Sequence, residues 1–246
     1  MWELVDQIYI TTYDGSPRID ECAREISYWK IPPKKLTWNI RPKMEDPKCV
    51  ISSAVKNHFE AFRDAKKKGY SNIIVLEDDF IVYNHSESIP ELDFKTNYFL
   101  QNYPDYDILY YGYMPLQIDP DYNDFGIIKM CGLLLHAYLI NERFYSIFLD
   151  LDTQLCVNSC CPFFKQPHDV LFFNIQFNQR RASYGVYPQL VYQNNFPLPA
   201  LFKKDNTRKD LFKNVVDATT EICYNGHLYK QIILIFIVII ILGKIK

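Results

Sequence analysis

An acidic triplet, residues 77–79, directly follows the apolar run Ile73–Leu76. A continuous apolar run of this length is typical of a strand that is buried on both faces of a parallel sheet. Side chains two residues apart in an extended chain point to the same side, so we expect Glu77 and Asp79 to face one side and Asp78 the other. Open α/β sheets bind their ligands at the carboxyl ends of such strands, which makes this triplet the first candidate for chemistry.

Two carboxylates that converge at a strand end repel each other unless a positive charge lies between them. Carboxylate oxygens suit a hard divalent cation, so Glu77 and Asp79 are candidate ligands of Mn²⁺ or Mg²⁺. Such an ion can bridge the diphosphate of a nucleotide-linked donor and offset the charge on a departing phosphate. The alternative is an acidic turn that caps the next segment or is simply solvated, and the residues alone leave both interpretations open.

The elements that must position this triplet alternate between strand and helix. We predict strands at residues 7–12, 36–40 and 73–76, separated by helices whose apolar residues recur at helical spacing. The second helix is expected to end at Gly69, because three lysines immediately precede that glycine. This alternation indicates βαβ units and hence an α/β domain.

The rest of the chain has a more mixed pattern. Residues 84–106 are polar and turn-rich, so we expect them to form an excursion over the surface. Further strands are predicted at residues 107–112, 127–130, 133–140 and 184–193. Helices are predicted to begin at Asn141 and at His168, with a loop at residues 153–167 between them.

Composition excludes several other classes of protein. The 246 residues carry 27 Lys and Arg against 29 Asp and Glu, so there is no basic field for nucleic acid. No glycine-rich dinucleotide or P-loop string occurs. The seven cysteines form no regular framework, and Cys156, Cys160 and Cys161 lack the paired spacing of a zinc site. The amino-terminal residues do not have the pattern of a signal peptide, so we expect a cytoplasmic protein.

Several segments resemble, in the same order along the chain, those of glycosyltransferase family 25. Cys49–Ser52 and the string IIVLEDDFIV are similar to the family's G-C-x-x-S-H helix and its E-D-D strand. DILYYG, LLLHAYLINERFYSIFL, HDVLFF and YGVYPQLVYQ match later segments. The family includes bacterial lipopolysaccharide glycosyltransferases and procollagen galactosyltransferases. The resemblance spans roughly residues 7–195 and implies a GT-A-like fold, a Rossmann-type sheet with helices on both faces.

The same resemblance implies an activity and roles for individual residues. It implies a metal-dependent, inverting transfer of a hexose, galactose or glucose, from a UDP-sugar to a hydroxyl of a glycan, lipid-linked or protein acceptor. By this resemblance Asp79 is the direct ligand of Mn²⁺ or Mg²⁺, and Glu77 helps to hold the metal or the ribose. Arg18, after the first strand, is expected to contact the nucleotide or a phosphate, although an ordinary surface arginine would look the same.

An inverting displacement needs a general base, and the resemblance points to Asp169 at the head of a helix. His168 is a candidate third metal ligand. The alternatives are an aspartate stabilised by the helix dipole and a histidine that only caps the helix. His58 falls on the apolar face of its helix, five residues past Ser53 rather than adjacent to it as in the family's Ser-His pair, so we expect a satisfied core histidine. His136 is likewise expected to be buried and hydrogen-bonded.

Two rival functions and one boundary stay open at this stage. The rivals are a metal-dependent phosphotransferase or phosphatase, and a degenerate glycosyltransferase that only binds. Residues 1–227 are expected to form the single domain, and residues 228–246 a hydrophobic tail. Within this tail, Ile232–Leu242 is continuously apolar, which as a helix is only about 16 Å long. With flanking residues it could anchor the protein to a membrane, and the alternative is a terminal element packed on the domain.

Overall fold

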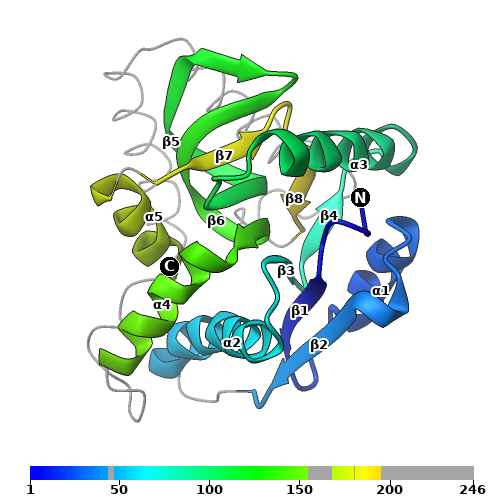
Figure 1. Cartoon of the computed structure of the whole chain (residues 1–246). Helices are drawn as coiled ribbons and strands as arrows, with labels where there is room; N and C mark the ends of the chain where they lie inside the picture. Colours follow the sequence, from blue (N-terminus) through cyan, green and yellow to red (C-terminus); the bar gives the residue numbers. More distant parts are fainter. Residues whose placement is uncertain (44–46, 155–167, 180, 195–246) are drawn as a thin grey trace, which may run out of the picture.

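The computed structural model describes residues 1–43, 47–154, 168–179 and 181–194. A six-stranded sheet of order β2-β1-β3-β6-β5-β7 lies at its centre, and a second sheet pairs β4 with β8 (Figure 1). The strands are β1 Gln7–Tyr13, β2 Leu36–Arg41, β3 Asn72–Glu77, β4 Phe80–Val82, β5 Ile108–Asp124, β6 Ile127–Asn141, β7 Ser183–Val186 and β8 Val191–Gln193. The helices are α1 Ile19–Tyr28, the 3₁₀ turn η1 Pro33–Lys35, α2 Pro47–Lys68, α3 His85–Asn102, α4 Glu142–Gln154 and α5 His168–Asn178.

The amino-terminal half of the sheet is parallel, as the strand–helix alternation predicts. β1 lies between β2 and β3 and runs parallel to both. Thr11 pairs with Glu77 on one side and with Asn39 on the other, so all three strands end at the same edge. The predicted α/β fold is therefore confirmed, and the acidic triplet lies at the carboxyl edge of a buried strand.

The carboxyl-terminal half of the sheet is mainly antiparallel, although β7 runs parallel to β5. β6 runs antiparallel to β3, with Ala137 opposite Leu76, and β5 pairs along β6. We predicted two strands at 127–130 and 133–140, but β6 is a single strand. Gly132 lies within β6 and does not interrupt it. A Cβ at this position would lie 3.0 Å from the Met114 carbonyl oxygen of β5. This glycine marks a close approach of two backbones rather than a turn.

The predicted strand at residues 184–193 is divided in two. β7 pairs with both β5 and β6 in the main sheet, whereas β8 pairs with β4 in the second sheet. Pro188 lies between them and has no backbone N–H to donate, so a continuous ladder cannot pass through it. The division brings Gln193, opposite Phe80, to the segment that follows the acidic triplet.

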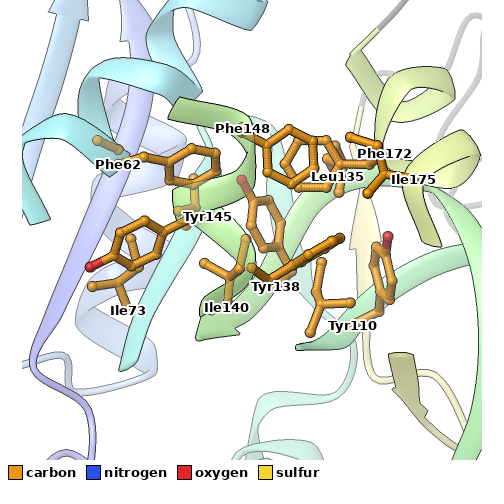
Figure 2. Packing of buried hydrophobic residues seen from close by; sticks show 14 of the residues in the cluster. Phe62, Ile73, Tyr110, Leu135, Tyr138, Ile140, Tyr145, Phe148, Phe172 and Ile175 are labelled. Atoms are coloured by element: carbon orange, nitrogen blue, oxygen red, sulfur yellow. The ribbon is translucent and has the colours of Figure 1, made fainter. Parts of the chain in front are cut away.

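Helices cover both faces of the main sheet (Figure 1). On one face α2, α4 and α5 pack over a cluster of buried aromatic and aliphatic side chains, in which the Phe148 and Phe172 rings stack 3.9 Å apart (Figure 2). On the other face α1 and α3 cover a second cluster that includes Cys22 and Leu92. Two separately covered faces explain why β3 reads as a continuous apolar run.

The expected surface excursion at residues 84–106 is wrong for most of its length, because α3 occupies residues 85–102. Leu92 and Phe99 are fully buried, one above the other on the same helix face, with the buried Thr96 between them. In the sequence, polar residues and the aromatic residues Phe94 and Tyr98 lie between these few apolar positions. They hid a helical period that only the packing against the sheet reveals.

Among the described residues, no helix is long and apolar enough to span a membrane. The predicted tail at residues 228–246, and with it the boundary at residue 227, lies outside the described residues. The same holds for Cys156, Cys160 and Cys161.

Candidate functional site

The acidic triplet consists of the last residue of β3, Glu77, and the two-residue turn Asp78–Asp79 that leads into β4. The Asp78 amide donates to the Thr11 carbonyl of β1 at 3.2 Å, and the Asn194 amide donates to the Asp79 carbonyl at 2.7 Å. The backbone of the turn is therefore tied to both sheets. This fixes where the three carboxylates emerge from the sheet edge.

Asp78 is a buried structural acceptor. Its Oδ2 accepts hydrogen bonds from the hydroxyls of Thr12 at 2.5 Å and Ser16 at 2.6 Å. Its Oδ1 lies 2.6 Å from Nη2 of Arg18. Asp78 thus ties the loop that follows β1 to the end of β3, and its charge is balanced there.

Asp79 is equally buried but incompletely paired. Only 6% of its side chain is exposed. Its Oδ2 accepts from Nε2 of Gln193 at 3.0 Å and lies 3.4 Å from Nη1 of Arg18. Its Oδ1 is buried, and no residue in the described ranges donates to it. Burial and the charge of Glu77 raise the pKa of Asp79 to about 7, although Arg18 and Gln193 act in the opposite direction.

Glu77 lies beside Asp79 and is held from its other side by a histidine. His58 on α2 places Nε2 3.2 Å from Oε1 of Glu77, and its Nδ1 lies 2.7 Å from the Tyr138 hydroxyl. His58 is buried, with 2% of its side chain exposed, whereas 20% of the Glu77 side chain is exposed. The expectation of a buried, satisfied His58 is confirmed, but its partner makes it part of the acidic site.

His136 lies on β6, one residue beyond the last β3–β6 pair and therefore opposite Glu77. It is fully buried, and within the described part of the chain neither ring nitrogen has a hydrogen-bond partner. The expectation that His136 is buried is confirmed, and the expectation that it is hydrogen-bonded stays a prediction. Burial lowers the pKa of His136 to about 4, so the ring is neutral, although the charge of Glu77 and the nearby Val191 carbonyl act in the opposite direction. That carbonyl does not meet the ring with hydrogen-bond geometry.

Of the residues predicted from the sequence, the structure brings together Arg18, Glu77 and Asp79. Arg18 is 28% exposed, and its guanidinium faces Asp78 and Asp79. α5 begins at His168 as predicted, but the side chains of His168 and Asp169 lie outside the described residues.

Sequence reasoning missed the partners that come from other strand ends. Thr12 and Ser16 lie at and just after the end of β1, where hydroxyl residues flanking the turn Asp14-Gly15 were a usable signal. Gln193 and Tyr138 gave no such signal, because their contacts depend on strand pairings formed far along the chain.

The residues at the strand end fit a divalent cation. The Arg18 guanidinium faces both Asp78 and Asp79, and the buried Oδ1 of Asp79 still lacks a donor among the described residues. Within those residues no group of three His, Cys, Asp or Glu side chains is arranged to hold a metal. Enzymes commonly bind Mg²⁺ through one or two carboxylates together with water and substrate phosphates. Glu77 and Asp79 meet that requirement.

Comparisons with known proteins give no family assignment. No protein-family model matches the chain, and no curated protein matches it, so the resemblance to glycosyltransferase family 25 remains a prediction. Solved structures of partly similar shape were found, and several of them are described as transferases.

One of these is a glycosyltransferase involved in the glycosylation of the major capsid of PBCV-1, with 9% identity, a TM-score of 0.43, and 84% of this chain and 99% of that chain covered. Another is a mannose-1-phosphate geranyltransferase from Thermus thermophilus, with 10% identity, a TM-score of 0.46, and 82% and 80% covered. A cytidylyltransferase from Leptospira borgpetersenii has 12% identity, a TM-score of 0.39, and 78% of each chain covered. TM-scores below 0.5 assign no activity, so the function has to be inferred from the strand end.

Proposed function

We propose that this chain is a metal-dependent inverting glycosyltransferase. It would move a hexose, galactose or glucose, from a UDP-sugar to a hydroxyl of a glycan, lipid-linked or protein acceptor. The observation that carries the proposal is the buried Asp79 carboxylate at the carboxyl end of β3, with one oxygen unpartnered among the described residues and the charge of Glu77 beside it. A buried carboxyl whose pKa is raised toward neutrality is a frequent mark of a functional site.

Glu77 and Asp79 are the residues that would hold Mn²⁺ or Mg²⁺. When bound, the ion supplies positive charge that offsets the negative charge of the leaving diphosphate. Asp78 holds the loop after β1 in place, and through it Arg18 stays at the same edge. Because 28% of the Arg18 side chain is exposed, its guanidinium can also contact a donor phosphate arriving at this edge.

The acceptor side of the reaction is proposed to depend on α5, which packs against β6. Asp169, the second residue of α5, would accept the proton of the acceptor hydroxyl as that oxygen attacks the anomeric carbon. The bond from this carbon to the diphosphate oxygen breaks as the new bond forms on the opposite face, which inverts the configuration. His168 would contribute a further ligand to the cation.

The test is release of UDP from UDP-galactose, UDP-glucose and UDP-GlcNAc by the full-length protein with Mn²⁺. We expect release from at least one donor, and its loss on adding EDTA or on the substitution Asp79→Asn. The matched control is Asp119→Asn, which removes the same charge at an exposed position.

Three results would count against the proposal. They are no UDP from any donor, activity that persists in EDTA, and an active Asp79→Asn variant. Release of inorganic phosphate from a phosphomonoester instead would favour the phosphotransferase alternative.

A further inference from the structure

His58 links the acidic strand end to the buried core. It lies on α2, and Tyr138 lies on β6, opposite Val75 and two residues past His136. The Tyr138 ring belongs to the aromatic cluster of Figure 2. The rings of His58 and Tyr138 are almost parallel, with an interplanar angle of 11° and centroids 5.9 Å apart. Both side chains are buried, so this arrangement is held by packing as well as by hydrogen bonds.

The hydrogen bonds determine which ring nitrogen carries the proton. The carboxylate of Glu77 can only accept, so Nε2 of His58 must donate across the 3.2 Å contact. In a neutral ring Nδ1 then carries the lone pair and accepts from the Tyr138 hydroxyl at 2.7 Å. Burial and the charge of Glu77 raise the pKa of Tyr138 well above its usual value, so this hydroxyl keeps its proton and can donate.

A fixed donor matters for Glu77 more than for its neighbours. Asp78 has four hydrogen-bond or ionic contacts, including its amide bond to Thr11, that hold it in the sheet edge. Glu77 has a longer side chain that is partly exposed, and its charge and that of Asp79 repel each other. The His58 contact restrains the orientation of the Glu77 carboxylate. Ligands of metals are commonly oriented in this way by a hydrogen-bonded partner behind them.

We propose that His58 is a positioning residue, which Tyr138 fixes as the Nε2–H tautomer and which thereby directs the Glu77 carboxylate toward a cation shared with Asp79. This inference rests on the proposed function, because it requires the cation site. It adds α2 to the elements that form the site, which the sequence analysis did not predict.

Two substitutions at the same position separate the two hydrogen bonds. In His58→Gln the side-chain amide nitrogen takes the place of Nε2 and can still donate to Glu77. In His58→Asn the shorter side chain reaches only the place of Nδ1, so the donor to Glu77 is lost. Binding of Mn²⁺ to the full-length protein without any donor sugar is measured by electron paramagnetic resonance of the free ion. We expect affinity to fall about 10- to 100-fold for Asn and to stay within a few-fold of wild type for Gln.

The outcomes distinguish this inference from the proposed function. If wild type binds Mn²⁺ and both variants bind it equally well, or lose it equally, the positioning role is overturned while the metal site stands. If wild type itself binds no Mn²⁺, with or without UDP, the proposed metal-dependent function and the inference fall together. Circular dichroism and urea unfolding of both variants check that each is folded.

A measurement on the wild type covers the case in which the variants do not fold. Nitrogen-15 spectra of histidine-labelled protein report which ring nitrogen carries hydrogen. We expect hydrogen on Nε2 and none on Nδ1. Hydrogen on Nδ1 overturns the inference.

Discussion

The buried charge of Asp79 should make the protein less stable as the pH rises, when no divalent cation is present. The pKa of Asp79 is about 7 in the folded protein, whereas an unperturbed Asp has a pKa of about 3.9. The unfolded chain therefore releases this proton first, and stability falls wherever the unfolded state binds fewer protons. This loss of unfolding free energy begins near pH 4, grows until about pH 7, and is constant above it. Asp79→Asn removes the titrating carboxyl and hence this loss.

The size of the effect follows from the two pKa values. Between these two pKa values, the loss of unfolding free energy grows by about 1.4 kcal/mol for each pH unit. From pH 5 to pH 8 the variant should therefore gain about 2–3 kcal/mol of unfolding free energy relative to wild type. Asp79 is almost completely buried, so solvent screening does not remove this difference. Effects that do not titrate, such as the changed bond to Gln193, shift both ends of the comparison equally.

The assay is urea unfolding of both proteins in EDTA at pH 5, 6, 7 and 8. The difference in unfolding free energy is plotted against pH, and Asp119→Asn provides an exposed control whose difference should stay flat above pH 5. A difference for Asp79→Asn that does not change with pH would refute the assignment of Asp79 as a buried, repelled carboxyl. Adding Mn²⁺ at pH 8 should stabilise wild type but not Asp79→Asn, and should therefore reduce the difference in unfolding free energy between the two proteins.

Four further predictions concern other parts of the chain. Asp78→Ala removes the acceptor of the Thr12 and Ser16 hydroxyls and the ionic partner of Nη2 of Arg18. Urea unfolding should therefore show a loss of about 2–4 kcal/mol, and a neutral result would contradict its structural role. Gly112→Ala would place a Cβ 2.1 Å from Nε2 of His136, so the same assay should show a loss of about 1–3 kcal/mol, which unchanged stability would disprove. Asp169→Asn should lower the transfer rate about 10²- to 10⁴-fold while calorimetry shows nearly unchanged donor binding, and a rate near wild type would remove it from the mechanism. Deleting residues 228–246 should leave an active protein that no longer floats with liposomes, whereas full-length protein that fails to float would contradict the anchor.

The parallel half of the fold could be predicted because its signals are local. The apolar run before Glu77 indicates a strand buried on both faces, and a glycine after three lysines marks the end of α2 at Lys68. Since parallel strands end at a common edge, the position of the carboxylates followed from the strand alone. These predictions needed no knowledge of which distant segments meet.

The antiparallel half and the support of the site could not be predicted in the same way. Gly132 looks like a turn residue until the backbone of β5 is placed beside it. His58 looks like any core histidine, because its role depends on the register that puts Tyr138 next to it. α3 was missed because only Leu92 and Phe99 carry its apolar face strongly. In each case the deciding contact joins residues from different elements.

These distances along the chain bear on when during folding the strand end becomes complete. His58 is 19 residues from Glu77 but 80 from Tyr138, and Gln193 is 114 residues from Asp79. Contacts of such separation cost loop-closure entropy and slow folding. A nascent chain that has formed only β1, α2 and β3 already carries the acidic triplet. It still lacks Tyr138, which hydrogen-bonds to His58, and Gln193, which donates to Asp79. Full affinity for a cation should therefore report completed folding rather than formation of the parallel half.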